Sequence, residues 1–200
     1  MAPGGRSEQN RAMEPVTLTT DRLLLRPVGP GDTDAVYEAV QDPDIQRWTT
    51  VPSPYLPEHA ISFTEQLVPE GWSQGSMFTF GVLAGGELVA MLALTMRSLG
   101  TAEVGFWAAK EHRGRGYVVE ATLTACRWIF TEVGVDRVEW RAEVGNHASR
   151  AVAERAGFTV EGTLRSGINN KGVRRDCWVG SLLPSDLSLP STAPYLPARA

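Results

Sequence analysis

The segment EVGFWAAKEHRGRGYVVEA, residues 103–121, joins an apolar aromatic stretch to a run with helical spacing. The join is HRGRGY, residues 112–117, with two glycines and two arginines. The pattern predicts a strand over 101–109 and a helix that begins near residue 117. Backbone N–H groups in the first turn of a helix lack partners, and glycines let a ligand approach them. The segment therefore favours a bound phosphate or pyrophosphate, with a capped turn and exposed arginines as the alternative.

Three other classes of anion-binding protein fit this segment less well. A P-loop needs Gly-Lys-Ser/Thr at the start of the helix, which is absent here. A dinucleotide-binding fingerprint needs a third glycine three residues after Gly116, where Val119 stands. A nucleic-acid-binding surface usually carries a basic excess, but Lys+Arg is 19 and Asp+Glu is 23, so the formal net charge is −4. We therefore expect no nucleic-acid partner.

The composition is that of a globular chain with a single domain. Of the 200 residues, 42% are apolar and 21% are charged. No apolar run approaches the roughly 18 residues of a membrane span, and the first residues lack the hydrophobic core of a signal peptide. The two cysteines and three histidines show neither disulfide nor metal-ligand spacing. We expect a cytoplasmic location, no membrane partner and no metal.

The order of elements predicts an α/β (α+β) fold, with helices packed on a mixed sheet. Residues 1–15 and 187–200 are expected to be tails, and 16–186 to be the domain. Helices are predicted from about residue 32 and over 57–67, 117–130 and 148–156. About seven strands are predicted, over 23–28, 77–83, 87–94, 101–109, 138–144, 158–164 and 175–183.

Four segments together resemble the GNAT superfamily of N-acetyltransferases, nearest to the branch of ribosomal-protein N-terminal acetyltransferases. They are LTTDRLLLRPVGPGD near the start, AEVGFWAAKEHRGRGYVVEA, NHASRAVAERAGFTVEGTLR from residue 146, and RRDCWVGSLLPSD near the end. They cover about residues 17–186 in the order typical of the family. The resemblance implies a mostly antiparallel sheet that is splayed in the middle and has helices on both faces.

The resemblance also implies acetyl-CoA as the co-substrate. Its pantetheine arm is expected to pair with the strand before the glycine turn, and its pyrophosphate to bind the N–H groups of the turn. The residues expected to hold CoA are Phe106, Trp107, Ala108, Arg113, Gly114, Arg115, Gly116, Tyr117 and Asn146. From its position alone, Asn146 is also a good helix N-cap.

Two residues are candidates for the proton transfers of acetyl transfer to an amine. In enzymes similar to this one, the serine of Asn-His-Ala-Ser reaches the CoA sulfur, which makes Ser149 the candidate acid. Glu103 shares one strand face with Trp107 and is the candidate base, with a solvated or salt-bridged glutamate as the alternative. Other members of this branch carry a glutamate at about the position of Ile168, and an isoleucine there cannot accept a proton. Asp176 is a further candidate.

The acceptor is expected to be a primary amine that attacks the thioester directly in a ternary complex. The sequence does not decide among three kinds of acceptor: a protein N-terminus, a small amine metabolite and an aminated antibiotic. The alternative to an enzyme is a non-catalytic sensor that binds acyl-CoA. Trp48 and Tyr55 are candidate contacts for the acceptor, with core packing as the alternative for each. We expect a monomer or a homodimer.

Overall fold

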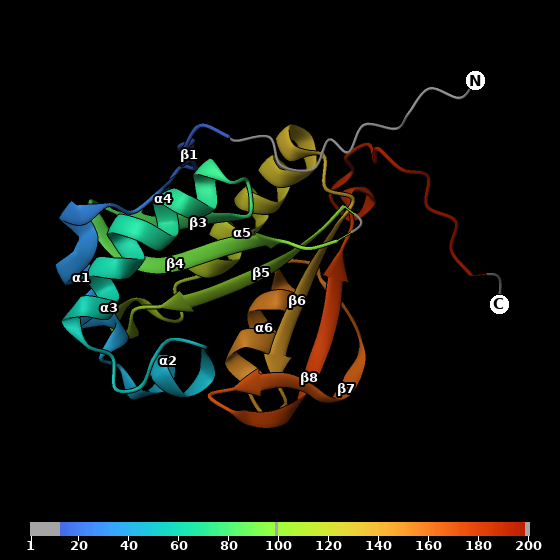
Figure 1. Cartoon of the computed structure of the whole chain (residues 1–200). Coiled ribbons are helices and arrows are strands. Elements are labelled where there is room, and N and C mark those ends of the chain that lie inside the picture. The colour runs from blue at the N-terminus through green and yellow to red at the C-terminus, as the bar shows by residue number, and fades with distance from the viewer. Residues whose placement is uncertain (1–12, 99, 199–200) are drawn as a thin grey trace, which may run out of the picture.

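The computed structural model describes residues 13–98 and 100–198, which form one mixed sheet with helices packed on it (Figure 1). The sheet has eight strands in the order β1-β2-β3-β4-β5-β6-β8-β7. The pair β5–β6 is parallel and the other pairs are antiparallel. The strands are β1 Leu18–Thr19, β2 Leu24–Arg26, β3 Met77–Ala84, β4 Glu87–Met96, β5 Thr101–Ala108, β6 Arg137–Glu143, β7 Thr159–Asn170 and β8 Val173–Leu182.

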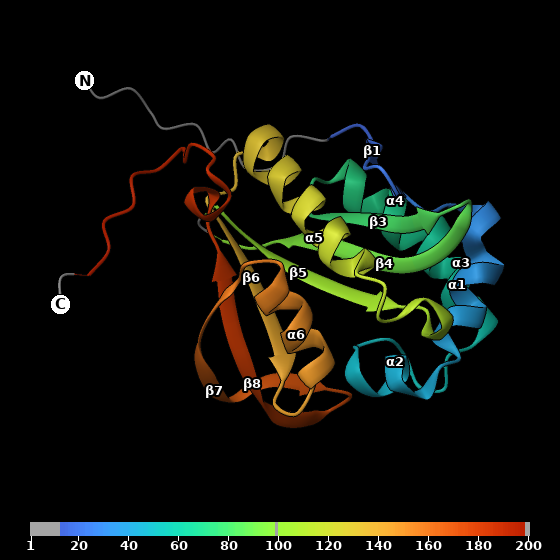
Figure 2. The ribbon, with the colours of Figure 1, turned by 180° about the vertical axis from the view of Figure 1, so that it is seen from behind.

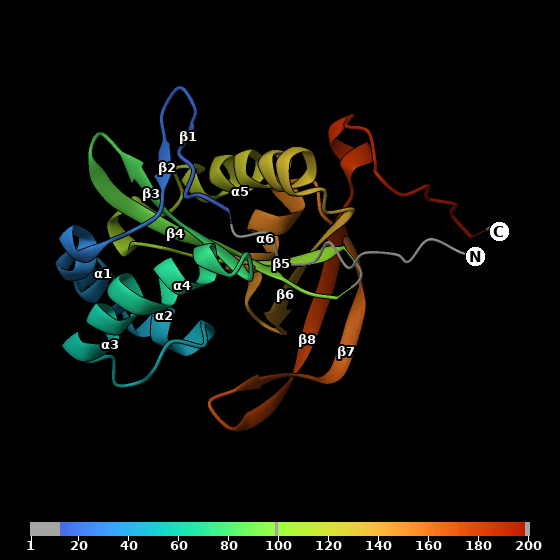
Figure 3. The ribbon, with the colours of Figure 1, turned by 45° about the horizontal axis from the view of Figure 1, so that its top comes forward.

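The helices lie on both faces of the sheet, as expected. Figure 2 shows α5 and α6 in front of the sheet, and Figure 3 shows α3 and α4 on the side opposite to α5. In Figure 1, no described helix lies over β6, β8 and β7 on the face turned to the viewer, which we call the open face. The helices are α1 Thr33–Val40, α2 Pro43–Trp48, α3 Pro57–Ser62, α4 Val68–Ser73, α5 Tyr117–Trp128 and α6 His147–Arg155.

Besides the short helix α2, the elements differ from the expected ones at three places. The additional strand is β1, a two-residue strand paired with β2. The helix expected over 57–67 runs on, because a π-helical turn over 63–67 connects α3 to α4. The strand expected to end near residue 164 is longer, because a bulge between Leu164 and Ile168 lets β7 continue beside β8 as far as Asn170.

The sheet is splayed between its two parallel strands. β5 pairs with β6 only from Thr101 to Val104, although β5 continues to Ala108 and β6 to Glu143. On its other side β5 stays paired with β4 as far as Ala108. The second half of β5 therefore has one free backbone edge, which faces the gap.

Aromatic packing fixes α4 and α5 to the sheet. Trp72 of α4, Phe78 and Phe80 of β3, and Trp128 of α5 form a cluster with ring centroids 5.1–5.8 Å apart. Trp72, Phe78 and Phe80 are almost fully buried, so this cluster contributes much of the apolar burial that stabilises the sheet. Because α5 is anchored at its C-terminal end, the glycine turn at its N-terminal end has a fixed position.

The predicted tails are partly packed. Residues 1–12 of the expected N-terminal tail lie outside the described residues, whereas Met13 is half-buried against the core. Leu187 and Leu189 also pack against the core, and the Asp136 carboxylate accepts hydrogen bonds from residues 191–193. The packed chain thus continues past the expected boundary at residue 186. None of the described helices is long and apolar enough to cross a bilayer.

Candidate active site

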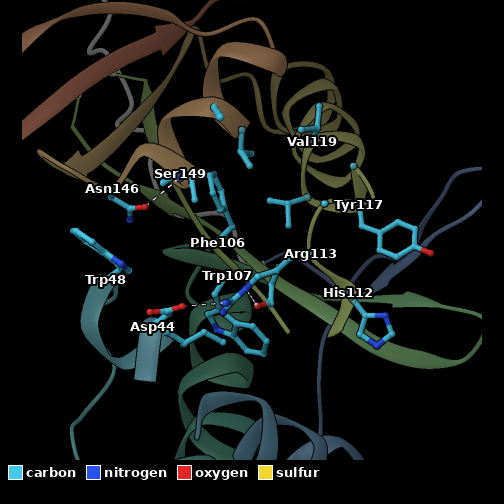
Figure 4. A pocket seen from close by; sticks show the side chains of 18 of the residues that line it. Asp44, Trp48, Phe106, Trp107, His112, Arg113, Tyr117, Val119, Asn146 and Ser149 are labelled. Carbon is cyan, nitrogen blue, oxygen red and sulfur yellow. Dashed lines mark hydrogen bonds and ion pairs between the residues drawn. The ribbon is translucent and has the colours of Figure 1, made fainter. Parts of the chain in front are cut away.

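A cavity of about 420 Å³ lies where the two parallel strands diverge (Figure 4). It is bounded by the end of β5, the glycine turn, the first turn of α5, α6 and the C-terminal end of α2. In Figure 4, Asn146 and Ser149, at the start of α6, lie across from Trp48 and Asp44 of α2, and Phe106 and Trp107 of β5 lie to one side of them.

The glycine turn has the conformation that an anion site needs. Gly114 and Gly116 have φ of +75° and +78°, in the left-handed region where other residues are strained. Gly116 is the N-cap of α5 and supplies no side chain, so the first N–H groups of the helix are left without a side-chain cap. A Cβ at Gly114 would have no heavy atom within 4 Å, so the backbone there is open to a ligand.

The two arginines of the turn are held in place by neighbouring groups. Arg113 forms ion pairs with Asp42 and with Asp44, the latter at 3.3 Å, and its Nε donates to the Ala108 carbonyl. Arg115 donates to the Glu111 carbonyl at 3.1 Å. The guanidinium of Arg113 thereby ties α2 to the turn. The Arg113 backbone N–H donates to the Lys110 carbonyl at 3.4 Å, so the backbone N–H groups of residues 114–117 are the ones open to an anion.

The end of β5 forms one wall of the cavity. Phe106, Trp107 and Ala108 all line it, as their expected role requires. These three residues lie beyond the last pair of β5 with β6, so their free backbone edge can pair with an extended ligand.

Ser149 has a hydroxyl proton to donate. The indole Nε1 of the buried Trp140 donates to Ser149 Oγ at 2.9 Å, which occupies an acceptor site of the hydroxyl. The Ser149 O–H can therefore point into the cavity. Asn146 accepts a hydrogen bond from the Ser149 backbone N–H at 3.1 Å, so it is the N-cap of α6 and also lines the cavity.

Glu103 lies on the opposite face of the sheet from Ser149. Strand alternation puts Val104 toward α5 and α6 and Glu103 toward the open face, beside the point where β5 and β6 diverge. Its carboxylate accepts a hydrogen bond from Arg97 at 3.1 Å and lies 3.9 Å from Arg141. Glu103 does not line the cavity. Its contacts are those of the alternative expected from the sequence, a salt-bridged glutamate.

The two residues expected to contact the acceptor lie in different places. Trp48 lines the cavity, and the Arg47 guanidinium covers its ring at 4.3 Å. Tyr55 does not line it: its side chain is only 5% exposed, and its ring lies against Tyr37 and His59. Burial raises the pKa of the Tyr55 hydroxyl. We therefore correct the expectation for Tyr55, because the loop before α3 turns its side chain into the core.

Asp176 also has a structural role. Its carboxylate accepts a hydrogen bond from the Ser166 backbone N–H at 2.8 Å and holds the bulge of β7. Ser166 has φ of +55°, so this contact stabilises an unfavourable backbone conformation.

An ion pair that the sequence did not predict holds α2 against β6. Arg47 makes two hydrogen bonds with Glu143 of β6, at 3.0 and 2.6 Å. These hydrogen bonds are the main reason why the pKa of Glu143 is lowered, and the nearby Arg175 adds to the effect. Alternation along β6 could have placed Glu143 on the open face, but nothing local links it to Arg47, 96 residues away.

A splayed sheet with a backbone anion site and a serine beside the gap is the architecture of an acyltransferase that uses a CoA thioester. The family model "Acetyltransferase (GNAT) domain" matches residues 22–159. The chain therefore belongs to the GNAT family and is an N-acetyltransferase that takes its acetyl group from acetyl-CoA.

Individual relatives agree with this assignment. "Putative ribosomal N-acetyltransferase YdaF" of Bacillus subtilis (strain 168) is 35% identical over 133 residues, which cover 64% of this chain and 72% of that protein. The structure of Mycobacterium smegmatis RimJ in complex with CoA-disulfide has a TM-score of 0.79 at 24% identity, over 88% of this chain and 92% of that one. A structure described as "Probable acetyltransferase" has a TM-score of 0.73 at 28% identity, over 86% and 98%.

Proposed function

We propose that this enzyme transfers the acetyl group of acetyl-CoA to the α-amine of a protein N-terminus, by direct attack in a ternary complex. The name of the 35% identical relative, a ribosomal N-acetyltransferase, supports a protein acceptor. The observation that carries the mechanism is the gap between β5 and β6, which has Ser149 on one face of the sheet and Glu103 on the other.

We assign the donor to the cavity side of the gap. The pyrophosphate of CoA would accept from the backbone N–H groups of residues 114–117, and the pantetheine arm would pair with residues 106–108. Arg155 of α6 also lines the cavity and is exposed, so it can approach a phosphate. Asn146 remains a candidate contact for the pantetheine arm in addition to capping α6.

The reaction forms a C–N bond and breaks the C–S bond of the thioester. The amine must lose a proton, and the leaving thiolate must gain one. We propose that Glu103, whose carboxylate is held beside the gap by Arg97, accepts the proton of the amine. Ser149 then donates a proton to the thiolate.

The surroundings of the two cysteines support direct transfer rather than an acetyl-cysteine intermediate. Cys126 is fully buried in α5, and burial raises the pKa of its thiol to about 12. Cys177 is also buried, which raises its pKa as well. A thiol that is both covered and protonated is a poor nucleophile.

The test is an incubation with acetyl-CoA and two sets of acceptors, N-terminal peptides and small primary amines, in which free thiol is followed and the products are identified by mass spectrometry. We expect acetylation of peptide α-amines. Faster turnover of small amines than of every peptide would reject the protein acceptor. Tight CoA binding without turnover of any amine would support the sensor that the sequence left open.

A further inference from the structure

The donor is assigned to the cavity side of the sheet, so the acceptor would arrive on the open face. This face carries a cluster of charged side chains that the proton transfers do not need. Glu143 of β6 has a side chain only 8% exposed, and its carboxylate binds Arg47 at 2.6 Å and lies 3.8 Å from Arg175 of β8. The Arg47 and Arg175 side chains are each about half exposed, at 46% and 50%. One buried carboxylate thus positions two guanidinium groups whose other N–H donors face solvent.

This cluster has a surplus positive charge, whereas the rest of the open face is balanced. Two arginines share one glutamate, so the net charge of the cluster is 2 − 1 = +1. Elsewhere on this face, three arginines match three glutamates: Arg97, Arg137 and Arg141 pair with Glu103, Glu139 and Glu161.

Arg47 connects the cluster to the cavity and is held in place by the hairpin. The Arg47 guanidinium rests on the ring of Trp48, which lines the cavity. The tip of the β7–β8 hairpin is fastened to the end of α2, since Lys171 Nζ donates to the carbonyls of Gln46 and Thr49 at 2.5 and 2.9 Å. Asn170 donates to the Arg47 carbonyl at 3.1 Å. Figure 1 shows this hairpin reaching α2.

We propose that Arg47 and Arg175, positioned by Glu143, bind a carboxylate side chain of the acceptor, so that the preferred substrates are N-termini with Asp or Glu among their first few residues. This inference rests on the proposed function. Guanidinium groups with fixed orientation bind carboxylates by charge-assisted hydrogen bonds, and arginine keeps its charge at every pH of interest. The cluster recognises the residues that follow the amine and takes no part in the proton transfers.

The test uses peptides that share one N-terminal residue and differ only at positions 2–4, which are Asp/Glu, Asn/Gln or Lys. We expect kcat/KM to be about tenfold higher for the acidic than for the neutral peptides, mainly through KM, and the preference to shrink as NaCl is raised. Arg175→Glu should abolish the acidic preference and favour the lysine peptides. Arg175→Gln should abolish it without inversion.

Arg174→Glu is the matched control. It makes the same change of charge one residue away, but alternation puts Arg174 on the other face of the hairpin. We expect this variant to keep the acidic preference. Equal kcat/KM for acidic and neutral peptides, or the same loss in Arg174→Glu as in Arg175→Glu, would overturn the inference while leaving the proposed function intact. Turnover of anionic small amines alone would overturn both.

Discussion

The Ser149 hydroxyl accepts a hydrogen bond from the Trp140 indole. Because Trp140 donates to Oγ, the serine O–H is the remaining group that can reach a thiolate in the cavity. Ser149→Ala should therefore lower kcat by about 100-fold, the lower range for a lost proton donor, with CoA affinity changed only a few-fold. Thiol release and calorimetric titration with CoA measure the two quantities. If CoA affinity and kcat fell equally, Ser149 would be a binding residue rather than the acid.

A matched variant of Glu139 distinguishes the role of Glu103 as a base from the role of the arginine network around it. Glu139 is the β6 partner of Glu103 in the sheet and is likewise bound to arginines on the open face. We expect Glu103→Gln to lower kcat/KM by about 100-fold near neutral pH, because the amine loses its proton acceptor. Glu139→Gln should stay within a few-fold of the original enzyme. Equal losses in the two variants would show that the arginine network, and not a base at Glu103, supports turnover.

At the scale of elements, the junction of β5 and α5 makes the function of the turn testable. Gly116→Trp should abolish CoA binding, because the indole would occupy the space in front of the N–H groups at the start of α5. Gly85→Trp in the β3–β4 hairpin is the control, since Gly85 also has positive φ and open space around it. Both variants carry the strain of a left-handed residue, about 1–2 kcal/mol. Only Gly116→Trp should lose CoA in a binding titration, and retention there would reject the anion site.

Most elements could be predicted from the sequence, because their signals are local. The β3–β4 hairpin, the helix that begins at Tyr117 and the cap at Asn146 each depend on residues within a few positions of one another. Alternation along β5 likewise placed Glu103 and Trp107 on one face. The contacts that organise the site are not local. Trp140 reaches Ser149 from another element, and Tyr55 turns inward because of packing against Tyr37, which no periodicity records.

At the scale of the whole molecule, ion pairs connect distant segments. Arg22 of the segment between β1 and β2 binds Glu120 of α5, Arg113 binds Asp42, and Arg137 binds Glu161. Hydrogen bonds from Arg137 lower the pKa of Glu161, and those from Arg47 lower the pKa of Glu143. Burial opposes the shift at Glu120, but hydrogen bonds from Thr20 and Arg22 lower its pKa on balance. The folded state therefore binds fewer protons than the unfolded chain at mildly acidic pH.

These carboxylates predict the direction of acid sensitivity. A carboxyl group whose pKa is lowered in the folded state stabilises it fully above the ordinary value, 4.5 for glutamate, and loses that contribution as the pH falls toward the folded-state value. We expect the melting temperature to be nearly constant from about pH 7 to pH 5 and to fall steeply below about pH 4.5. A melting temperature that held steady to pH 3 would contradict this view of the ion pairs.

Glu143 gives this prediction a test at a single site. Its side chain is nearly buried, and its carboxylate accepts two hydrogen bonds from the Arg47 guanidinium. A neutral amide cannot replace both, so Glu143→Gln should lower the free energy of unfolding by roughly 1–2 kcal/mol at pH 7. The difference between the two proteins should shrink as the pH falls from 4.5 toward the lowered pKa of folded Glu143, because protonation of this carboxyl removes the same interaction. Glu65→Gln is the control, because Glu65 is exposed and forms no ion pair within the described residues. Thermal unfolding of the three proteins between pH 3 and pH 7 measures the effect, and a constant difference across that range would assign the loss to packing rather than to charge.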